Sequence, residues 1–145
     1  MSNQERASIV AIIISLLLNA YVIVRLVQLF GSGALSGEHA TTVWAQAIVW
    51  VIPAAIVLTI VLNCLFAMAS KDRNQRNIVD ERDRLFQLRG LSVTLISIGI
   101  GYMTMIVMLA AGWTAVVGLT VLYASCAVGD LVGNTVRIAS YRIGG

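Results

Sequence analysis

Four long apolar runs dominate the chain, and one charged stretch, residues 70–90, separates the second run from the third. Each run holds about twenty residues or more, which is the length that a helix needs to cross the ~30 Å hydrocarbon core of a bilayer. Apolar residues make up 59% of the chain and charged residues 12%, a balance far from that of soluble domains. The sequence therefore predicts an all-α, polytopic integral membrane protein, with residues 1–145 in a single transmembrane domain.

The runs place the four predicted transmembrane helices at about residues 8–30, 43–69, 91–111 and 115–136. Short loops join the first span to the second and the third to the fourth, so we expect two helical hairpins linked by the charged loop. Because proline has no N–H to donate, Pro53 predicts a kink within the second span. Each hairpin ends with an asparagine inside the membrane, Asn63 or Asn134, and a serine and an arginine follow where the chain leaves the membrane. A pseudo-two-fold relation about the membrane normal and chance both explain that match.

Lysine and arginine concentrate on one side of the predicted topology. Six of the ten cations lie in residues 70–90 and others lie near the two chain ends, whereas the two remaining loops hold none. The positive-inside rule then predicts that both termini and the charged loop are cytoplasmic. The three tryptophans, Trp44, Trp50 and Trp113, fall toward the opposite interface, where amphipathic rings prefer to lie.

Asp130 is the most informative single residue, because a carboxylate inside the bilayer is costly and rarely faces lipid. It lies about 9 Å of helix rise from the predicted end of the fourth span. It shares a helix face with Asn134 and Arg137. Asn63 lies at a similar depth in the second span, so these four residues form a predicted intramembrane polar cluster. Two interpretations stay open: a proton- or cation-binding carboxylate, or a structural ion pair with Arg137 or Arg89.

Small residues spaced four apart mark two of the spans. They are Ser125, Gly129 and Gly133 in the fourth span, and Ser97 and Gly101 in the third. Such ladders let helix backbones approach closely. They predict helix packing, either within the chain or between two copies of it, and the spacing does not separate these two alternatives.

The charged loop carries the candidate partner-docking residues Asp80, Glu81, Arg82, Asp83 and Arg84. The stretch predicts an interfacial helix that leads directly into the third span, with Asp80 paired to Arg84 at i, i+4. One interpretation is a solvated helix whose charges pair with one another. The other is a docking surface for a cytoplasmic or membrane partner.

No catalytic, cofactor-binding or metal-ligating residue is predicted, and no cofactor is expected. His39 is the only histidine, which excludes a bis-histidine haem site or a histidine-rich metal site within one chain. No nucleophile–base pair can be named, so the sequence does not predict an enzyme. The formal charge of +3 is too small to indicate a nucleic-acid partner. The expected partners are the lipid bilayer and either another protein or further copies of this chain.

The Asp-Glu-Arg-Asp core at residues 80–83, followed by Leu85 and a glycine-led third span, resembles a family of small four-span prokaryotic membrane proteins. That family is known as a domain of unknown function. The resemblance covers most of the chain and implies the two-hairpin architecture and a bacterial or archaeal cytoplasmic (inner) membrane. It implies no catalytic residues, and it suggests an accessory or regulatory role.

Two functions of different classes follow from these features. The first is a non-enzymatic membrane protein that acts through protein–protein contacts as an accessory subunit, a regulator or an immunity-type protein. The second is a small homo-oligomeric ion- or proton-coupled transporter or channel that uses Asp130. The sign that discriminates them is whether Asp130 faces a wet cavity or a protein-filled contact.

Overall fold

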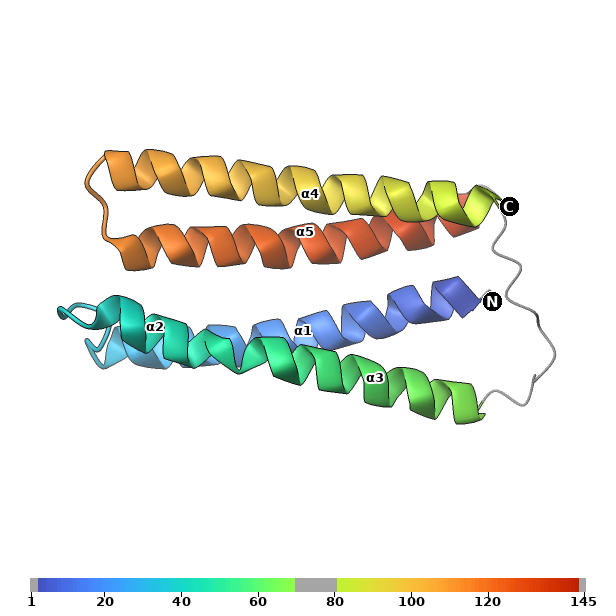
Figure 1. The fold of residues 1–145 in the computed structure, drawn as a ribbon, viewed down its shortest axis with the longest axis horizontal. Coiled ribbons are helices and arrows are strands. Elements are labelled where there is room, and N and C mark those ends of the chain that lie inside the picture. The colour runs from blue at the N-terminus through green and yellow to red at the C-terminus, as the bar shows by residue number, and fades with distance from the viewer. Residues whose placement is uncertain (1–2, 70–80, 144–145) are drawn as a thin grey trace.

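A computed structural model describes residues 3–69 and 81–143, without the side chains of residues 3–7, 63, 66, 67, 69, 81–83 and 143. The described residues form helices joined by short turns (Figure 1). The helices are α1 (Asn3–Gly31), α2 (Ala40–Val49), α3 (Val51–Ala69), α4 (Glu81–Ala110) and α5 (Ala115–Ile143). The predicted all-α class is confirmed for this part of the chain.

Four helical segments are long and apolar enough to cross a membrane, and they correspond to the four predicted runs. They are Ser8–Gly31, Ala40–Leu62, Arg84–Ala110 and Ala115–Arg142. The helix that was expected before the third span is continuous with it, because α4 begins at Glu81. The end of the fourth span differs from the prediction: α5 continues through residue 136 to Ile143, so the expected tail is mostly helical.

The second apolar run is interrupted where the kink was expected. Helix α2 ends at Val49 and α3 begins at Val51, with Trp50 between them in a helical backbone conformation. Pro53 lies four residues after Val49 and has no N–H for its carbonyl, so the hydrogen-bond ladder breaks there. The next donor, the N–H of Ala54, reaches the Trp50 carbonyl at 3.2 Å. The two helices therefore follow one bent path (Figure 1).

Helix α5 is the central element of the fold. It packs along α4 on one side and along α1 on the other, and α3 packs on the far side of α1 (Figure 1). Helix α2 contacts both α1 and α5. Toward the end that carries both termini, α3 diverges from α5 (Figure 1). The four long segments thus form an open arc in which α3 has its substantial contacts with α1 and α2 only, as far as the described residues show.

The α4–α5 contact is a seam of small residues. A Cβ atom added at Gly129 would lie 2.8 Å from the Ser97 Cβ and 3.2 Å from the Thr94 carbonyl oxygen. Added Cβ atoms at Gly101 and Gly133 would overlap Ser125 and Thr94, respectively. The structure therefore places all of the predicted ladder residues at a packing contact within the chain.

The seam is also polar in part, because the two backbones are close enough for a side chain to bridge them. The Thr94 hydroxyl on α4 lies 3.0 Å from the carbonyl oxygen of Gly129 on α5, as well as 3.2 Å from that of Gly90 on its own helix. Such hydrogen bonds between membrane helices contribute about 0.6–2 kcal/mol.

The loop end of the bundle is held by a turn and a small core. Gly112, with φ +83°, follows α4, and the N–H groups of Gly112 and Trp113 donate to the carbonyls of Leu109 and Met108 at 3.1 and 3.0 Å. These two hydrogen bonds form a Schellman cap, which requires a residue with left-handed backbone angles. Glycine adopts such angles without strain. Beneath it, the buried residues Leu35, Ala40 and Val116 pack together with Trp44.

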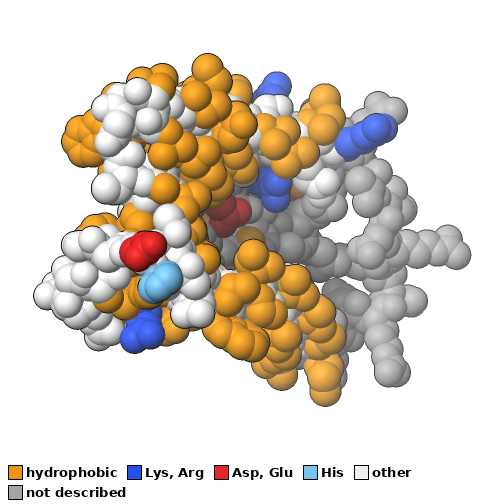
Figure 2. Space-filling view, turned by 60° about the vertical axis from the view of Figure 1, so that its left-hand side comes forward, with side chains coloured by type: hydrophobic (Ala, Val, Ile, Leu, Met, Phe, Trp, Pro, Cys, Tyr) orange, Lys and Arg blue, Asp and Glu red, His pale blue; other side chains and the backbone are white. Residues whose placement is uncertain are grey.

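Most large apolar side chains point outward from this arc. Leu17, Ile60, Ile100 and Val107, for example, are each more than half exposed, and apolar side chains cover much of the surface in Figure 2. In water such a surface would be an aggregation liability. Lipid tails are as apolar as leucine, so exposing the same surface to a bilayer carries no such cost.

Candidate functional site

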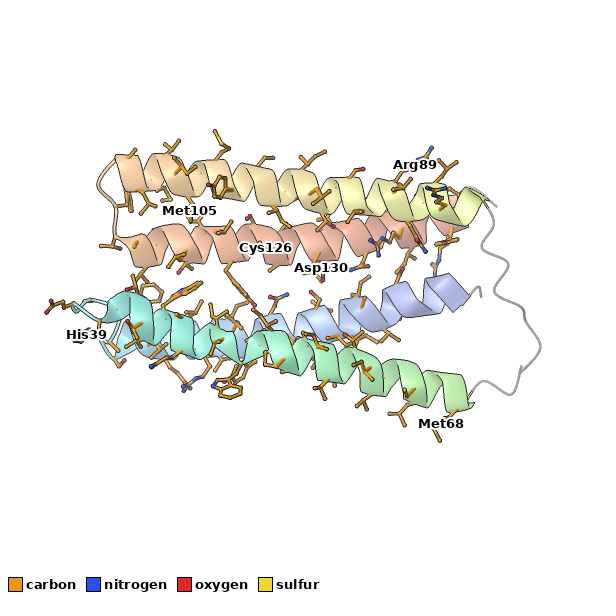
Figure 3. All side chains as sticks on the ribbon, viewed as in Figure 1. His39, Met68, Arg89, Met105, Cys126 and Asp130 are labelled. Atoms are coloured by element: carbon orange, nitrogen blue, oxygen red, sulfur yellow. The ribbon has the colours of Figure 1, made fainter. Side chains whose placement is uncertain are left out.

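The carboxyl group of Asp130 is held by one neighbour on its own helix. Asp130 lies on α5, on the side that faces α1, and it is half-buried (Figure 3). The Asn134 amide, one helical turn later, donates to Asp130 Oδ1 at 3.0 Å and to the Asp130 carbonyl oxygen at 2.9 Å. Asn134 is only 4% exposed, so this amide is a fixed donor. Among the described residues, hydrogen bonding reaches only one of the two carboxylate oxygens.

Arg137 does not neutralise that carboxylate. Its Nη1 donates to Asn134 Oδ1 in a long contact of 3.4 Å, and its Nε is buried without a hydrogen-bond partner. The side chain runs toward α4, where a Cβ added at Gly90 would lie 2.6 Å from Nε. The expected direct ion pair with Arg137 is therefore absent from the described structure, and Arg89 is exposed on α4. Asn134 separates the two charges because it occupies the space between them.

A cavity of about 310 Å³ lies beside Asp130, between α1, α3 and α5. Helix α5 contributes Tyr123, Cys126, Ala127 and Asp130 to its wall; α1 contributes Ala11, Ile14, Ser15, Leu18 and Asn19; α3 contributes Val51, Ala55 and Thr59. Asp130 is the only charged side chain among these described lining residues. In the space-filling view, an acidic group lies recessed beside apolar side chains, with a Lys or Arg side chain next to it (Figure 2).

The neutral polar groups of the wall already have hydrogen-bond partners. The Tyr123 hydroxyl donates to Asn19 Oδ1 at 2.7 Å, and this bond joins α5 to α1. The Asn19 amide donates in turn to Ser15 Oγ at 3.1 Å. The Thr59 hydroxyl donates to the Ala55 carbonyl at 2.7 Å. The carboxylate of Asp130 is therefore the group of this wall with the largest unused capacity to bind a ligand.

The helices near the cavity are tied together toward the loop end and diverge toward the termini. On the loop side, Trp44 Nε1 on α2 donates to Thr120 Oγ1 on α5 at 3.0 Å, which ties the two walls together. On the other side, α3 diverges from α5 (Figures 1 and 3). The arrangement is a groove between three helices with one acid in its described wall.

The remaining predicted site residues divide into two sets. Asp80 and the side chains of Asn63, Glu81, Arg82 and Asp83 lie outside the described residues, and Arg84 is exposed near the start of α4. The ladder residues Ser97, Gly101, Ser125, Gly129 and Gly133 lie at the α4–α5 seam, away from the cavity. No group of three or more metal-ligating side chains occurs in the part of the chain that the structure describes.

Three residues at or near the site were missed by the sequence reasoning. Trp44 was assigned to the membrane interface, yet its ring N–H donates inward to Thr120 on α5. Ser15 carries a signal that was available, because it precedes Asn19 by four residues and so shares its helix face. Thr59 had no such signal, since its place depends on how α3 sits against α1.

Comparisons with protein-family models, with curated proteins and with solved structures give no match to this chain.

Proposed function

We propose that the protein spans the cytoplasmic membrane of a prokaryote four times, as two hairpins with both termini inside. The four long apolar helices and their exposed apolar side chains support insertion. The orientation rests on the distribution of cations along the sequence, and Arg84, Arg89, Arg137 and Arg142 lie near the start of α4 and the end of α5.

Within that frame, we propose that Asp130 binds a proton or a small cation for a small ion-coupled transporter. The observation that carries the proposal is that Asp130 lines an open cavity and has no cationic partner among the side chains that the structure describes. A charged acid in hydrocarbon costs at least ~2.5 kcal/mol even on the most lenient insertion scale. One amide donor does not offset that cost, so water, a proton or a cation must do so. The proposed function is non-enzymatic.

A transport path also needs a wall that one chain does not supply. The cavity lies between α3 and α5, which diverge, and four spans seldom enclose a path. We therefore place the function in a homo-oligomer, in which a second copy closes the open side.

Reconstitution in liposomes tests this function. With a pH gradient or a monovalent-cation gradient imposed, the wild-type protein should carry a flux of the ion across the membrane. Asp130→Asn keeps the shape and the Asn134 contact but removes the charge, so it should fold normally and abolish the flux. Glu38→Gln, an exposed acid in the loop between α1 and α2, is the matched control and should transport normally. Equal flux in wild type and Asp130→Asn would refute the proposal.

One observation favours a second candidate, a membrane protein that acts by contacting other proteins. Helix α3 has its substantial contacts with α1 and α2 only, and its outward face is apolar and exposed. A partner helix could cover this face, and residues 81–84 of the predicted docking set begin α4. Reversing Asp80, Glu81 and Asp83 to lysine should then release a protein that co-purifies in mild detergent, with no change in thermal unfolding. If the same proteins co-purify with the wild type and with the triple-lysine variant, this candidate loses its support.

A further inference from the structure

The size of the cavity argues against a bare metal ion as its occupant. At about 310 Å³ it has room for about ten water molecules, taking ~30 Å³ for each. Hard cations such as Mg²⁺ and Ca²⁺ require about six or more oxygen ligands at close range. Here the described wall offers one carboxylate, while Tyr123, Asn19 and Ser15 are hydrogen-bonded in a chain and the Thr59 hydroxyl donates to the Ala55 carbonyl. The described residues do not form a dedicated metal cage.

Half of the lining residues are aliphatic, and they come from all three helices. Ala11, Ile14, Leu18, Val51, Ala55 and Ala127 line the cavity together with the one acid. A mostly apolar cleft with a single fixed charge is typical of a binding site for a small organic molecule that carries the opposite charge. Neither a proton nor a hydrated inorganic ion would make use of this apolar surface.

The aromatic ring of Tyr123 adds a second feature that suits an organic cation. Tyr123 lies seven residues before Asp130, so both side chains project from the same face of α5. Its hydroxyl is anchored on Asn19, which fixes the ring at the wall of the cavity. A cation near an aromatic face gains an attraction that grows when water is excluded.

We propose that the cavity binds an amphiphilic organic cation, with its ammonium group at Asp130 and its apolar body against the walls from α1 and α3. This inference rests on the proposed cation site at Asp130 and names the class of its substrate. The ligand enters from the open end, where α3 diverges from α5. Its charge replaces the missing cationic partner of Asp130, and its alkyl groups displace water from the apolar wall.

A series of symmetric tetraalkylammonium ions, from tetramethyl to tetrabutyl, measures both features. Binding to the purified full-length protein in mild detergent is followed by titration calorimetry. Each methylene that becomes fully buried should strengthen binding by about fourfold. Tetraethylammonium should therefore bind at least about tenfold more tightly than tetramethylammonium, even with partial burial. Affinity should then fall for the member that exceeds the cavity. Equal affinity for all members of the series would overturn the inference.

Two neighbouring alanines on α3 provide a matched pair of variants. Ala55 lines the cavity, whereas Ala54 is exposed on the outer side of the helix. Ala55→Phe should fill the cavity and weaken tetrapropylammonium binding by at least about tenfold, while Ala54→Phe should leave it unchanged. Equal binding by both would place the ligand elsewhere and overturn the inference. A circular-dichroism melt of each variant shows that it is folded.

The same variants separate this inference from the proposed function. Liposome flux of protons or sodium that depends on Asp130, with no tetraalkylammonium binding in any member of the series, would overturn the organic substrate and leave the ion site standing. Tetraalkylammonium binding that is lost in Asp130→Asn and in Ala55→Phe supports both. If Asp130→Asn changes neither flux nor binding, both proposals fail.

Discussion

The two sides of α5 are built in opposite ways. Toward α4 it presents Ser125, Gly129 and Gly133, and the two backbones meet closely along a seam. Toward α1 and α3 it presents Tyr123, Cys126 and Asp130, and a cavity remains. Membrane helices associate through close packing and hydrogen bonds, because lipid competes equally well for apolar side chains. A groove of about 390 Å³, lined by Ser97, Gly101 and Ser125, also runs along the α4–α5 contact. The two sides of α5 therefore differ in their chemistry, because only the cavity toward α1 and α3 has a charged side chain among its described lining residues.

The largest effect should come from adding bulk to the seam. Gly129→Val places its methyl groups against Ser97 and the Thr94 carbonyl, and we expect a loss of about 3 kcal/mol or more. Unfolding in mixed detergent–SDS micelles measures it. Gly99→Val is the matched control, because a Cβ at Gly99 meets nothing within 4 Å. Similar losses for both variants would show that the seam is not packed as described.

The next effect should come from the amide that separates Asp130 from Arg137. Asn134→Leu leaves a half-buried carboxylate without its donor and Arg137 without its acceptor, so we expect a loss of about 2 kcal/mol. The same unfolding assay measures it. Thr135→Val alters the adjacent exposed residue, whose hydroxyl bonds only within its own helix turn, and it should be nearly neutral. A neutral Asn134→Leu would mean that water already satisfies both charges.

Across the cavity, one hydrogen bond is expected to hold α1 to α5. Tyr123→Phe removes the hydroxyl that donates to Asn19, and the stability should fall by about 0.6–2 kcal/mol. Tyr102→Phe, which changes a half-exposed tyrosine on α4, should have no effect in the same assay. A double-mutant cycle with Asn19→Ala isolates the pair. Additive losses in that cycle would contradict the direct bond.

The smallest effect should appear at the loop end of the cavity. Trp44→Phe loses the hydrogen bond to Thr120 but keeps most of the apolar packing. We therefore expect the free energy of unfolding to fall by about 0.6 kcal/mol. Trp113→Phe, at an exposed ring in the turn between α4 and α5, is the control. Trp44→Phe should also make the cavity reachable from the loop side. If small reagents reach it no faster than in wild type, Trp44 is not the seal.

Much of the fold was predictable from the sequence because length and apolarity define membrane helices. Pro53 predicted the bend, and the spacing of Asp130 and Asn134 predicted their contact. The order of the helices around α5 was not predictable. In lipid, an outward face and an inward face are both apolar, so no polar stripe shows which face meets a neighbour. For the same reason, residue spacing alone did not predict that the Arg137 side chain runs toward α4. It also did not predict the hydrogen bond from Trp44 to Thr120, because both contacts depend on how the helices are placed.

A cation reaches Asp130 from the aqueous phase only if the cavity beside it holds water and opens toward the termini. The native Cys126 lines that cavity and is half-buried, which makes it a direct probe. In a Cys64→Ser background, a charged, membrane-impermeant thiol reagent is applied to sealed vesicles of each orientation. Ala54→Cys, in a background without either native cysteine, gives the rate for a residue that faces lipid.

The account predicts that Cys126 reacts well above the Ala54→Cys rate, and only from the side where the termini lie. Thiols react as thiolates, which form in water and not in hydrocarbon. A Cys126 that stays unreactive from both sides, yet reacts fully once the protein is unfolded, would show a dry contact beside Asp130 and would contradict the account.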